Sequence, residues 1–215
     1  MPACHADAPT APKGQTAKKS WQRVLGDSIL GAVDRVLDSK ALRGLAHPLR
    51  IRLLGLLRTD GPATATQLAD RVGERSGTTS WHLRQLAAHG FIEEDTARGN
   101  RRERWWRAVH EHTVLPLDEL AGDEEMRTPL DGYLHEVVTT HYHRSAAFLA
   151  EWQRWPKQWL AATALSDTTL SLTVAELEEL TRRMHELLAE FRRERRDGDE
   201  QVAVQFHAFP EPGRC

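Results

Sequence analysis

Apolar residues recur at intervals of three and four along most of the chain, the spacing at which side chains share one face of an α-helix. This spacing predicts a helix over residues 20–37, two short helices within 39–60, and a longer helical region over 133–164. The break between the two short helices is expected at His47-Pro48, because proline lacks a backbone N–H and restricts the residue before it.

The stretch from Thr64 to Gly90 predicts two further helices joined by a tight turn. Thr64-Ala-Thr-Gln67 fits a capping box, in which a hydroxyl and an amide satisfy free N–H groups at a helix start. Gly73 is expected to end the first helix, and the turn after it has the length used in helix-turn-helix motifs. Ser76 is a favourable N-cap for the second helix, over residues 77–89.

The second of these helices has two distinct faces. At 100° per residue Thr79, Leu83 and Leu86 fall on one side, which predicts the buried face. His82 lies to the side and is expected to be packed rather than free. The opposite side carries polar residues that solvent or a partner would meet.

After Gly90 the pattern changes to alternation. Residues 91–109 predict two strands around a hairpin tip at 96–102, with Gly99-Asn100 at the turn. A helix-turn-helix followed directly by a basic hairpin is the arrangement of a winged helix.

The remainder of the chain is predicted to be largely helical. Residues 110–132 are acidic and rich in turn-forming residues, which suggests a connector. A second capping box at Thr173-Val-Ala-Glu176 opens a helix with a short apolar seam. Residues 202–209 alternate as in a strand, which would need a partner strand to be stable.

The predicted fold class is therefore mainly α, a winged helix-turn-helix with a small β-hairpin wing, followed by a helical C-terminal extension that ends in a short strand. The expected division is a disordered tail over 1–19, a winged helix-turn-helix domain with a leading helix over 20–110, and a helical domain over 111–215 for dimerisation or effector binding.

Charge is unevenly distributed along a chain whose formal net charge is −2. Residues 40–110 contain 13 Lys/Arg against 7 Asp/Glu, a net charge of +6, so the rest carries −8. Such a division predicts a basic working surface on an otherwise acidic protein.

The cysteines and the apolar runs exclude further classes of protein. Cys4 and Cys215 lie at opposite ends, so neither a structural disulfide nor a thiolate metal site is expected. No apolar run approaches the roughly 20 residues of a membrane span, and the first residues lack the apolar core of a signal peptide. These features predict a cytoplasmic protein without a membrane partner.

Residues 40–109 resemble the ArsR-type bacterial winged-helix repressors. The resemblance rests on LRGLAHPLRIRLLGLL, QLADRV, TTSWHLRQLAAHGFIEE and an arginine-rich hairpin ending in RWWRA. It implies a homodimeric transcription regulator that binds an inverted repeat in double-stranded DNA and releases it when an effector binds. The long extension is similar to that of actinobacterial members.

This chain departs from that family at two places. Metal-sensing relatives carry a cysteine pair on the helix that corresponds to residues 49–57, where this chain has none, so thiolate metal sensing is not implied. Family members often have histidine or arginine at the position of Trp81. An indole offers one donor and a large apolar face, so it would meet a thymine methyl or a sugar rather than read guanine.

The candidate DNA contacts divide into phosphate and base contacts. Arginines at the wing and at the start of the second helix are expected to bind phosphates, together with backbone amides near Ser76. Polar side chains on the outward face of the helix are expected to meet base edges. The expected DNA-binding residues are Arg75, Ser76, Thr78, Ser80, Trp81, Arg84, Gln85, Arg98, Arg101 and Arg102.

The extension offers two apolar groups whose roles stay open. Tyr133, Trp152, Trp155 and Trp159 could line an effector pocket or a dimer seam. Leu177, Leu180, Met184, Leu187 and Phe191 are expected to mediate dimerisation or internal packing. Histidines such as His141 and His143 lie about 200° apart on a helix and do not predict a metal site.

No nucleophile with its base, no glycine-rich phosphate loop and no interpretable carboxylate pair stands out, so neither enzyme activity nor a cofactor is expected. Two alternatives to a DNA-binding regulator remain. One is a winged-helix module that binds a protein through its hairpin and tryptophans. The other is a small-molecule-binding regulator in which the extension is the active part.

Overall fold

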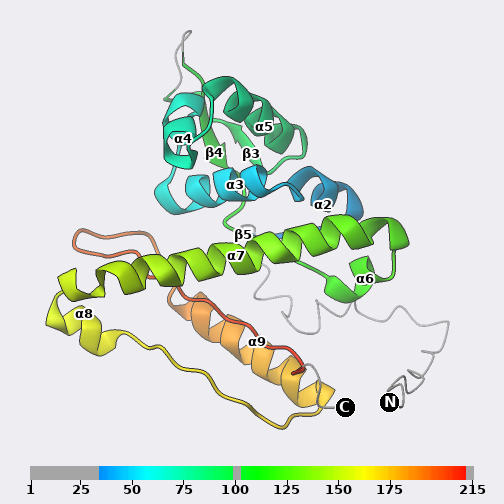
Figure 1. Ribbon diagram of the computed structural model, residues 1–215, viewed down its shortest axis with the longest axis vertical. Helices are drawn as coiled ribbons and strands as arrows, with labels where there is room; N and C mark the ends of the chain where they lie inside the picture. The colour runs from blue at the N-terminus through cyan, green and yellow to red at the C-terminus, as the bar shows by residue number, and fades with distance from the viewer. Residues whose placement is uncertain (1–33, 99–102, 212–215) are drawn as a thin grey trace. The chain divides into compact units, whose positions relative to one another are not determined.

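The computed structural model describes residues 34–98 and 103–211. The chain forms two compact units, a large unit that spans Leu30–Thr168 and a small unit that contains Thr169–Cys215 (Figure 1). In chain order the large unit contains β1 (Asp34–Val36), α2 (Ser39–Leu45), α3 (Pro48–Asp60), β2 (Ala63–Thr64), α4 (Ala65–Val72), α5 (Ser76–Ala88), β3 (Ile92–Glu94), β4 (Trp105–Ala108), β5 (His112–Val114), α6 (Leu117–Ala121), η1 (Glu124–Met126), α7 (Arg127–Glu151), η2 (Trp152–Arg154) and α8 (Lys157–Ala162).

Helices α2 to α5 and a small sheet enclose the core of the large unit. The side chains of Leu42, Leu53, Leu68, Leu83 and Leu86 are completely buried. Burying an aliphatic side chain of this size stabilises a fold by about 1.5–3 kcal/mol. The sheet has the order β2-β4-β3 and is antiparallel throughout, as a wing requires. The prediction of a winged helix-turn-helix is confirmed.

Two short parallel strands, β1 and β5, lie at the start and at the end of the winged helix-turn-helix. β1 pairs with β5, with Asp34 opposite His112 and Val36 opposite Val114. The helix predicted over 20–37 is therefore wrong at its end; residues 20–33 lie outside the described residues. The backbone of 34–36 is held by a partner distant in sequence, and Asp38 then caps α2 by accepting from the Ala41 N–H at 2.7 Å. An apolar spacing cannot reveal such a partner.

The segment 110–132 is not the connector that its composition suggested. It contains β5, α6 and η1 and leads into α7. Leu120 and Met126 are buried in the same core as the winged helix, and so are Leu130 and Tyr133 from the first turns of α7. The apolar residues of this segment are few, and Leu117 among them is exposed, so its composition alone did not indicate a part of the core.

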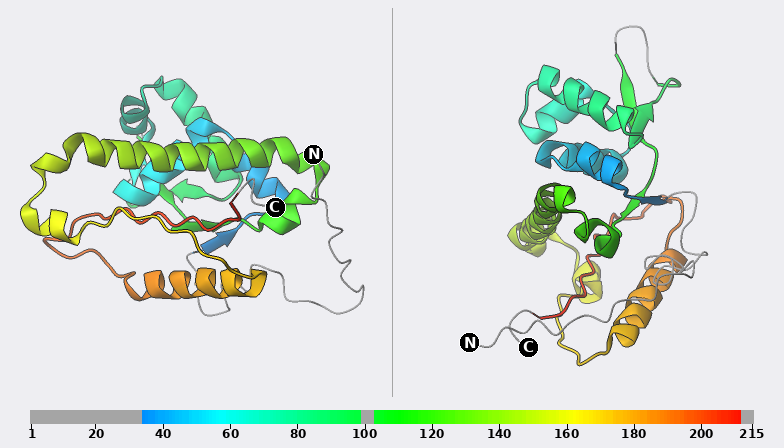
Figure 2. Two further views of the ribbon diagram at one scale, coloured as in Figure 1. Left: turned by 60° about the horizontal axis from the view of Figure 1, so that its bottom comes forward. Right: turned by 90° about the vertical axis from the view of Figure 1, so that its right-hand side faces the viewer.

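Helix α7 is long and differs between its two halves. Its first half packs on α2 and α3 (Figures 1 and 2). Its second half carries Val138, Tyr142 and Leu149 in exposed positions. At 100° per residue these three side chains fall within an arc of about 40°, so they form one apolar stripe. The helical region predicted over 133–164 is confirmed; Pro156 separates its last helix, α8, from η2.

The small unit contains α9 (Val174–Glu190). The capping box predicted at Thr173 and Glu176 is present in full. None of the residues of α9 is buried. Residues 202–209 form no strand, so that prediction is wrong; the alternation is real, but no strand lies beside it among the described residues. Within residues 34–98 and 103–211, no helix is long and apolar enough to cross a membrane.

Candidate nucleic-acid interface

The joint between α4 and α5 is built by local sequence signals. Thr64 accepts from the Gln67 N–H at 3.3 Å, and the Gln67 side chain accepts from the Thr64 N–H at 2.9 Å. Gly73 ends α4 in the left-handed conformation, with φ of 72°, which a residue with a Cβ adopts at a cost. The capping box and the glycine stop are both confirmed.

Ser76 does not cap α5. The N-cap is Arg75, whose backbone is extended and whose carbonyl accepts from the Thr79 N–H at 3.0 Å. The helix therefore begins one residue earlier than expected, and Ser76 is its first helical residue. No side chain caps this end, which leaves the first amides of α5 without a side-chain acceptor.

The two faces of α5 are divided as predicted. Thr79, Leu83 and Leu86 are completely buried, and His82 is buried beside them. The outward side carries Thr78, Trp81 and Arg84 in exposed positions, with Ser80 and Gln85 half-buried between them. The Trp81 side chain is 48% exposed, so its indole is available to a partner. Helix α5 thus presents donors, acceptors and one large aromatic face together.

The arginines around α5 differ in whether a carboxylate lies next to them. In the parts of the chain that the structure describes, Arg75 and Arg84 have no carboxylate partner. Arg98, at the wing, lies 3.6 Å from a carboxylate oxygen of Asp95. On the strands of the wing Arg104 pairs with Glu94 at 3.0 Å and Arg107 with Glu93 at 2.6 Å. The two other expected wing contacts, Arg101 and Arg102, lie outside the described residues.

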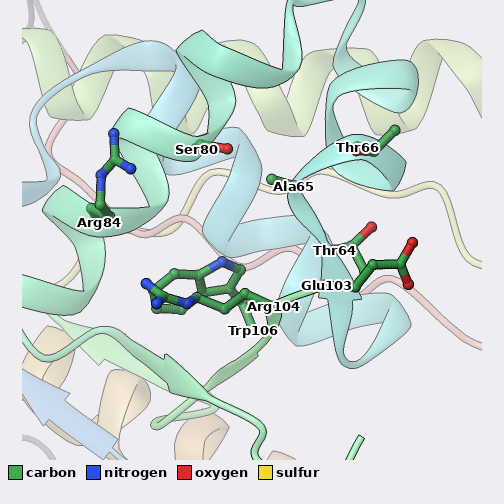
Figure 3. Close-up of a pocket in the computed structure, with 8 residues that line it drawn as sticks. All are labelled: Thr64, Ala65, Thr66, Ser80, Arg84, Glu103, Arg104 and Trp106. Carbon is green, nitrogen blue, oxygen red and sulfur yellow. The ribbon is translucent and has the colours of Figure 1, made fainter. Parts of the chain in front are cut away.

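A cavity of about 360 Å³ lies between the start of α4, the outward side of α5 and β4 (Figure 3). Ser80 and Arg84 line it from α5, and Thr66 lines it from α4. On the β4 side Arg104 lies over the Trp106 ring, 5.6 Å from its centroid. Arg104 and Trp106 were not among the predicted site residues, although the alternation of the strand over 105–108 could have revealed that they line this cavity.

Histidines connect the inner side of α5 to the start of α3. His47 accepts from the Leu49 N–H at 3.2 Å and so caps α3. Its ring lies 4.4 Å from that of His82, which in turn meets Trp81 edge to face at 4.7 Å. Among the described residues Nδ1 of His82 is buried without a hydrogen bond.

Burial and nearby cations both oppose a further positive charge on these histidines. Burial first, and then His47 and Arg50, lower the pKa of His82, while Glu74 acts in the opposite direction. The pKa of His47 is lowered by burial and by Arg50, against Glu136. The rings thus act as neutral packing groups behind the exposed Trp81.

The other predicted groups are not brought together. Tyr133 belongs to the core, whereas Trp152 and Trp155 are exposed beyond the end of α7, about 28 Å along the helix from Tyr133 at 1.5 Å per residue. The four aromatic residues therefore do not line one pocket. Trp155 and Trp159 do contact each other edge to face at 6.3 Å. No group of three or more metal-ligating side chains occurs among the residues that the structure describes.

Helices α3, α4 and α5, the tight α4–α5 turn and the antiparallel wing define a winged helix-turn-helix domain. Domains of this class bind DNA and regulate transcription. Residues 45–95 match the sequence family of a helix-turn-helix domain. The match spans α3, α4, α5 and β3 and leaves the extension uncovered. No curated protein matches the chain.

Proposed function

We propose that the protein is a homodimeric transcription repressor that reads an inverted-repeat operator with residues 77–89 and with the wing at 96–104. One observation carries the proposal: α5 buries its apolar side chains completely and offers polar side chains on the other side, beside a cavity lined by Arg84, Arg104 and Glu103. Residues 20–110 would bind DNA, and residues 111–215 would form the dimer.

Base reading is assigned to the outward side of α5. Arg84 can pair bidentately with guanine and Gln85 with adenine, at about 1–3 kcal/mol of discrimination for each pair. Thr78 and Ser80 can accept or donate to either kind of base. Trp81 supplies an apolar face for a thymine methyl group or a sugar.

Phosphate binding is assigned to the arginines and the uncapped start of α5. Arg75, Arg98, Arg101 and Arg102 would meet phosphates, together with the amides next to Ser76, where the helix dipole favours an anion. Arg75 supports the assignment because it has no carboxylate partner in the described ranges. Arg98 would have to exchange Asp95 for a phosphate, which lowers its contribution.

The proposal is tested by selecting bound sequences from random DNA and measuring affinity for the selected site at several salt concentrations. Affinity should fall steeply with salt, since bound cations release counterions from the DNA. The double variant Arg84→Ala, Arg101→Ala should lose specific binding. The matched control Arg127→Ala, Arg154→Ala removes two exposed arginines elsewhere and should bind as tightly as the unchanged protein. Specific binding by the first double variant would refute the assigned surface.

Dimerisation is assigned to apolar seams in the extension. Leu177, Leu180, Met184, Leu187 and Phe191 supply one seam on α9, where no residue is buried. The stripe of Val138, Tyr142 and Leu149 on α7, which was not among the predicted seams, supplies a second one. The variants Met184→Glu and Tyr142→Glu distinguish the two candidate seams, because only the variant in the true seam becomes monomeric. Light scattering after gel filtration measures the mass of each variant. A dimer in both variants would contradict both assignments.

Release of the operator by a small-molecule effector belongs to the same proposal. The exposed Trp152 and Trp155 and the half-buried Trp159 remain candidates for an aromatic binding site or for a part of the dimer seam. Binding of a ligand there would change the fluorescence of these tryptophans. The change should be smaller in a Trp155→Leu variant, which lacks one of them. A complex with a protein that is insensitive to salt, without any DNA affinity, would favour an interaction module instead.

A further inference from the structure

A second cavity lies in the large unit and shares no lining residue with the cleft of Figure 3. Its volume is about 350 Å³, and its walls come from α3, from the last turn of α4 and from the second half of α7. Small-molecule sites have volumes of roughly 300–1,000 Å³. The cavity is therefore large enough for a compact organic ligand.

Three arginines line this cavity, one from each helix: Arg52 of α3, Arg71 of α4 and Arg144 of α7. The lining contains a single carboxylate, Asp60, and Arg71 already pairs with it at 2.6 Å. Over the described ranges neither Arg52 nor Arg144 has a carboxylate partner. Two exposed arginines without a carboxylate partner therefore line one small space, a charge pattern that favours an anion.

The rest of the lining includes apolar side chains. Ile51, Leu56 and Val72 line the cavity and pack at the same time against the buried core. Such a surface attracts the hydrocarbon part of a ligand. An inorganic ion such as phosphate would leave it uncovered.

A glycine keeps the cavity open. Gly55 lies in the middle of α3, where glycine destabilises a helix by about 1 kcal/mol relative to alanine. It lines the cavity, and a Cβ added to it would meet no atom within 4 Å. Packing therefore does not demand glycine here, and a larger side chain would occupy the space.

We propose that the α3–α4–α7 cavity binds an organic anion, a carboxylate or sulfonate attached to an apolar body of about the size of one or two aromatic rings. The acidic group lies between Arg52 and Arg144, and the apolar body covers Ile51, Leu56 and Val72. The ligand contacts both α4, which precedes the recognition helix, and α7. This site is separate from the DNA-binding surface and does not depend on DNA binding.

The test is a fluorescence titration of the full chain with 8-anilinonaphthalene-1-sulfonate, an aromatic anion. The uncharged N-phenyl-1-naphthylamine, which has the same rings without the sulfonate, is titrated in parallel. The sulfonate should bind saturably at one site per chain, and about tenfold more tightly than the uncharged probe, because two exposed charge pairs together contribute up to about 2 kcal/mol.

Three variants locate the site. Arg52→Gln with Arg144→Gln should weaken sulfonate binding about tenfold and leave the uncharged probe unchanged. Gly55→Leu should weaken both probes, because its side chain fills the cavity. The control Arg127→Gln with Arg154→Gln removes the same charge outside the cavity and should change neither affinity by more than about twofold.

Circular dichroism shows whether each variant keeps its helices; exposed arginines and an open glycine site leave the core untouched. Three results would overturn the assignment: no saturable sulfonate binding by the unchanged protein, an affinity within twofold in both the arginine and the Gly55 variants, or equal binding of the two probes.

Discussion

Helices α5 and α9 are similar in sequence pattern and opposite in environment. Both carry apolar residues at intervals of three and four. In α5 the inward residues Thr79, Leu83 and Leu86 are completely buried. In α9 no residue is buried, and Phe191 just beyond its end is 76% exposed.

The difference shows what periodicity determines and what it leaves open. Spacing decides which side chains share a face of a helix. Whether that face is covered depends on elements elsewhere in the chain or on another molecule. For α5 the cover comes from α2, α3, α4 and the wing. Since most helix stability in proteins comes from such packing, the two helices should respond differently to the same substitution.

The largest difference is expected between Leu83→Ala and Leu180→Ala. Leu83 is completely buried, so its truncation should reduce the free energy of unfolding by about 2–5 kcal/mol. Leu180 is only partly covered within its own chain and, at a protein concentration low enough to keep the chain monomeric, should change it by less than about 1 kcal/mol. Urea denaturation of both variants measures the difference. An equal loss would mean that α9 is packed in solution, as a dimer seam would require.

A smaller difference is expected between Thr64→Ala and Thr173→Ala, which remove the same kind of capping box. Thr64 is buried where α4 joins the core, and its loss should cost about 1 kcal/mol of global stability. Thr173 is exposed, so its loss should fray only the first turn of α9. Amide hydrogen exchange distinguishes the two; a global destabilisation by Thr173→Ala would contradict the expectation.

Acidification should weaken the side of the molecule that holds α5. Burial first, and cationic neighbours second, lower the pKa of His82 from its ordinary value of 6.5. The unfolded chain therefore binds protons that the folded chain does not, and stability falls as the pH is lowered through about 6.5. His82→Gln should flatten this dependence in urea denaturation at pH 7.5, 6.5 and 5.5. His185→Gln on α9 is the matched control; an unchanged slope in His82→Gln would refute the role of His82.

The smallest effect concerns the exposed charges of α9. Hydrogen bonds from Arg182 and Arg183 lower the pKa of Glu179 from 4.5 to about 2. What this carboxylate contributes to the helix is therefore present above pH 4.5 and is lost as the pH falls toward 2. The carboxyl carbon of Glu179 should keep the NMR shift of an ionised group down to about pH 3, unless Arg182 and Arg183 are both replaced by Gln. A titration near 4.5 in the unchanged protein would contradict the network.

Local signals explain why much of the winged helix could be predicted. Thr64, Gly73 and the inward face of α5 act within one or two turns of chain, so their residue types and spacing suffice. Ser76 is an instructive exception. It has a favourable type for a cap, but the extended backbone of Arg75 starts the helix one residue earlier.

Contacts between distant residues explain the errors. The strand at 34–36 exists because 112–114 lies beside it. The segment 202–209 stays irregular because no strand of the described residues lies beside it. The expected charge of the wing changes in part for the same reason, because strand pairing brings Glu93 next to Arg107 and Glu94 next to Arg104. Residue types predicted these two cations, but only the pairing of strands revealed their partners; Arg98 and Asp95 meet within the hairpin, three residues apart.

β1 and β5 limit where the protein can be cut without loss of its fold. The segment that matches the helix-turn-helix family, 45–95, excludes both strands as well as Leu120, Met126, Leu130 and Tyr133. An excised fragment with those boundaries would lack α2 and would expose the side of α3 that α2 and these residues cover. The shortest piece that retains the whole core runs from residue 34 to residue 137. The segment that matches the helix-turn-helix family is thus shorter than the segment that forms the core. A fragment made to carry the helix-turn-helix into another protein should therefore include the first half of α7.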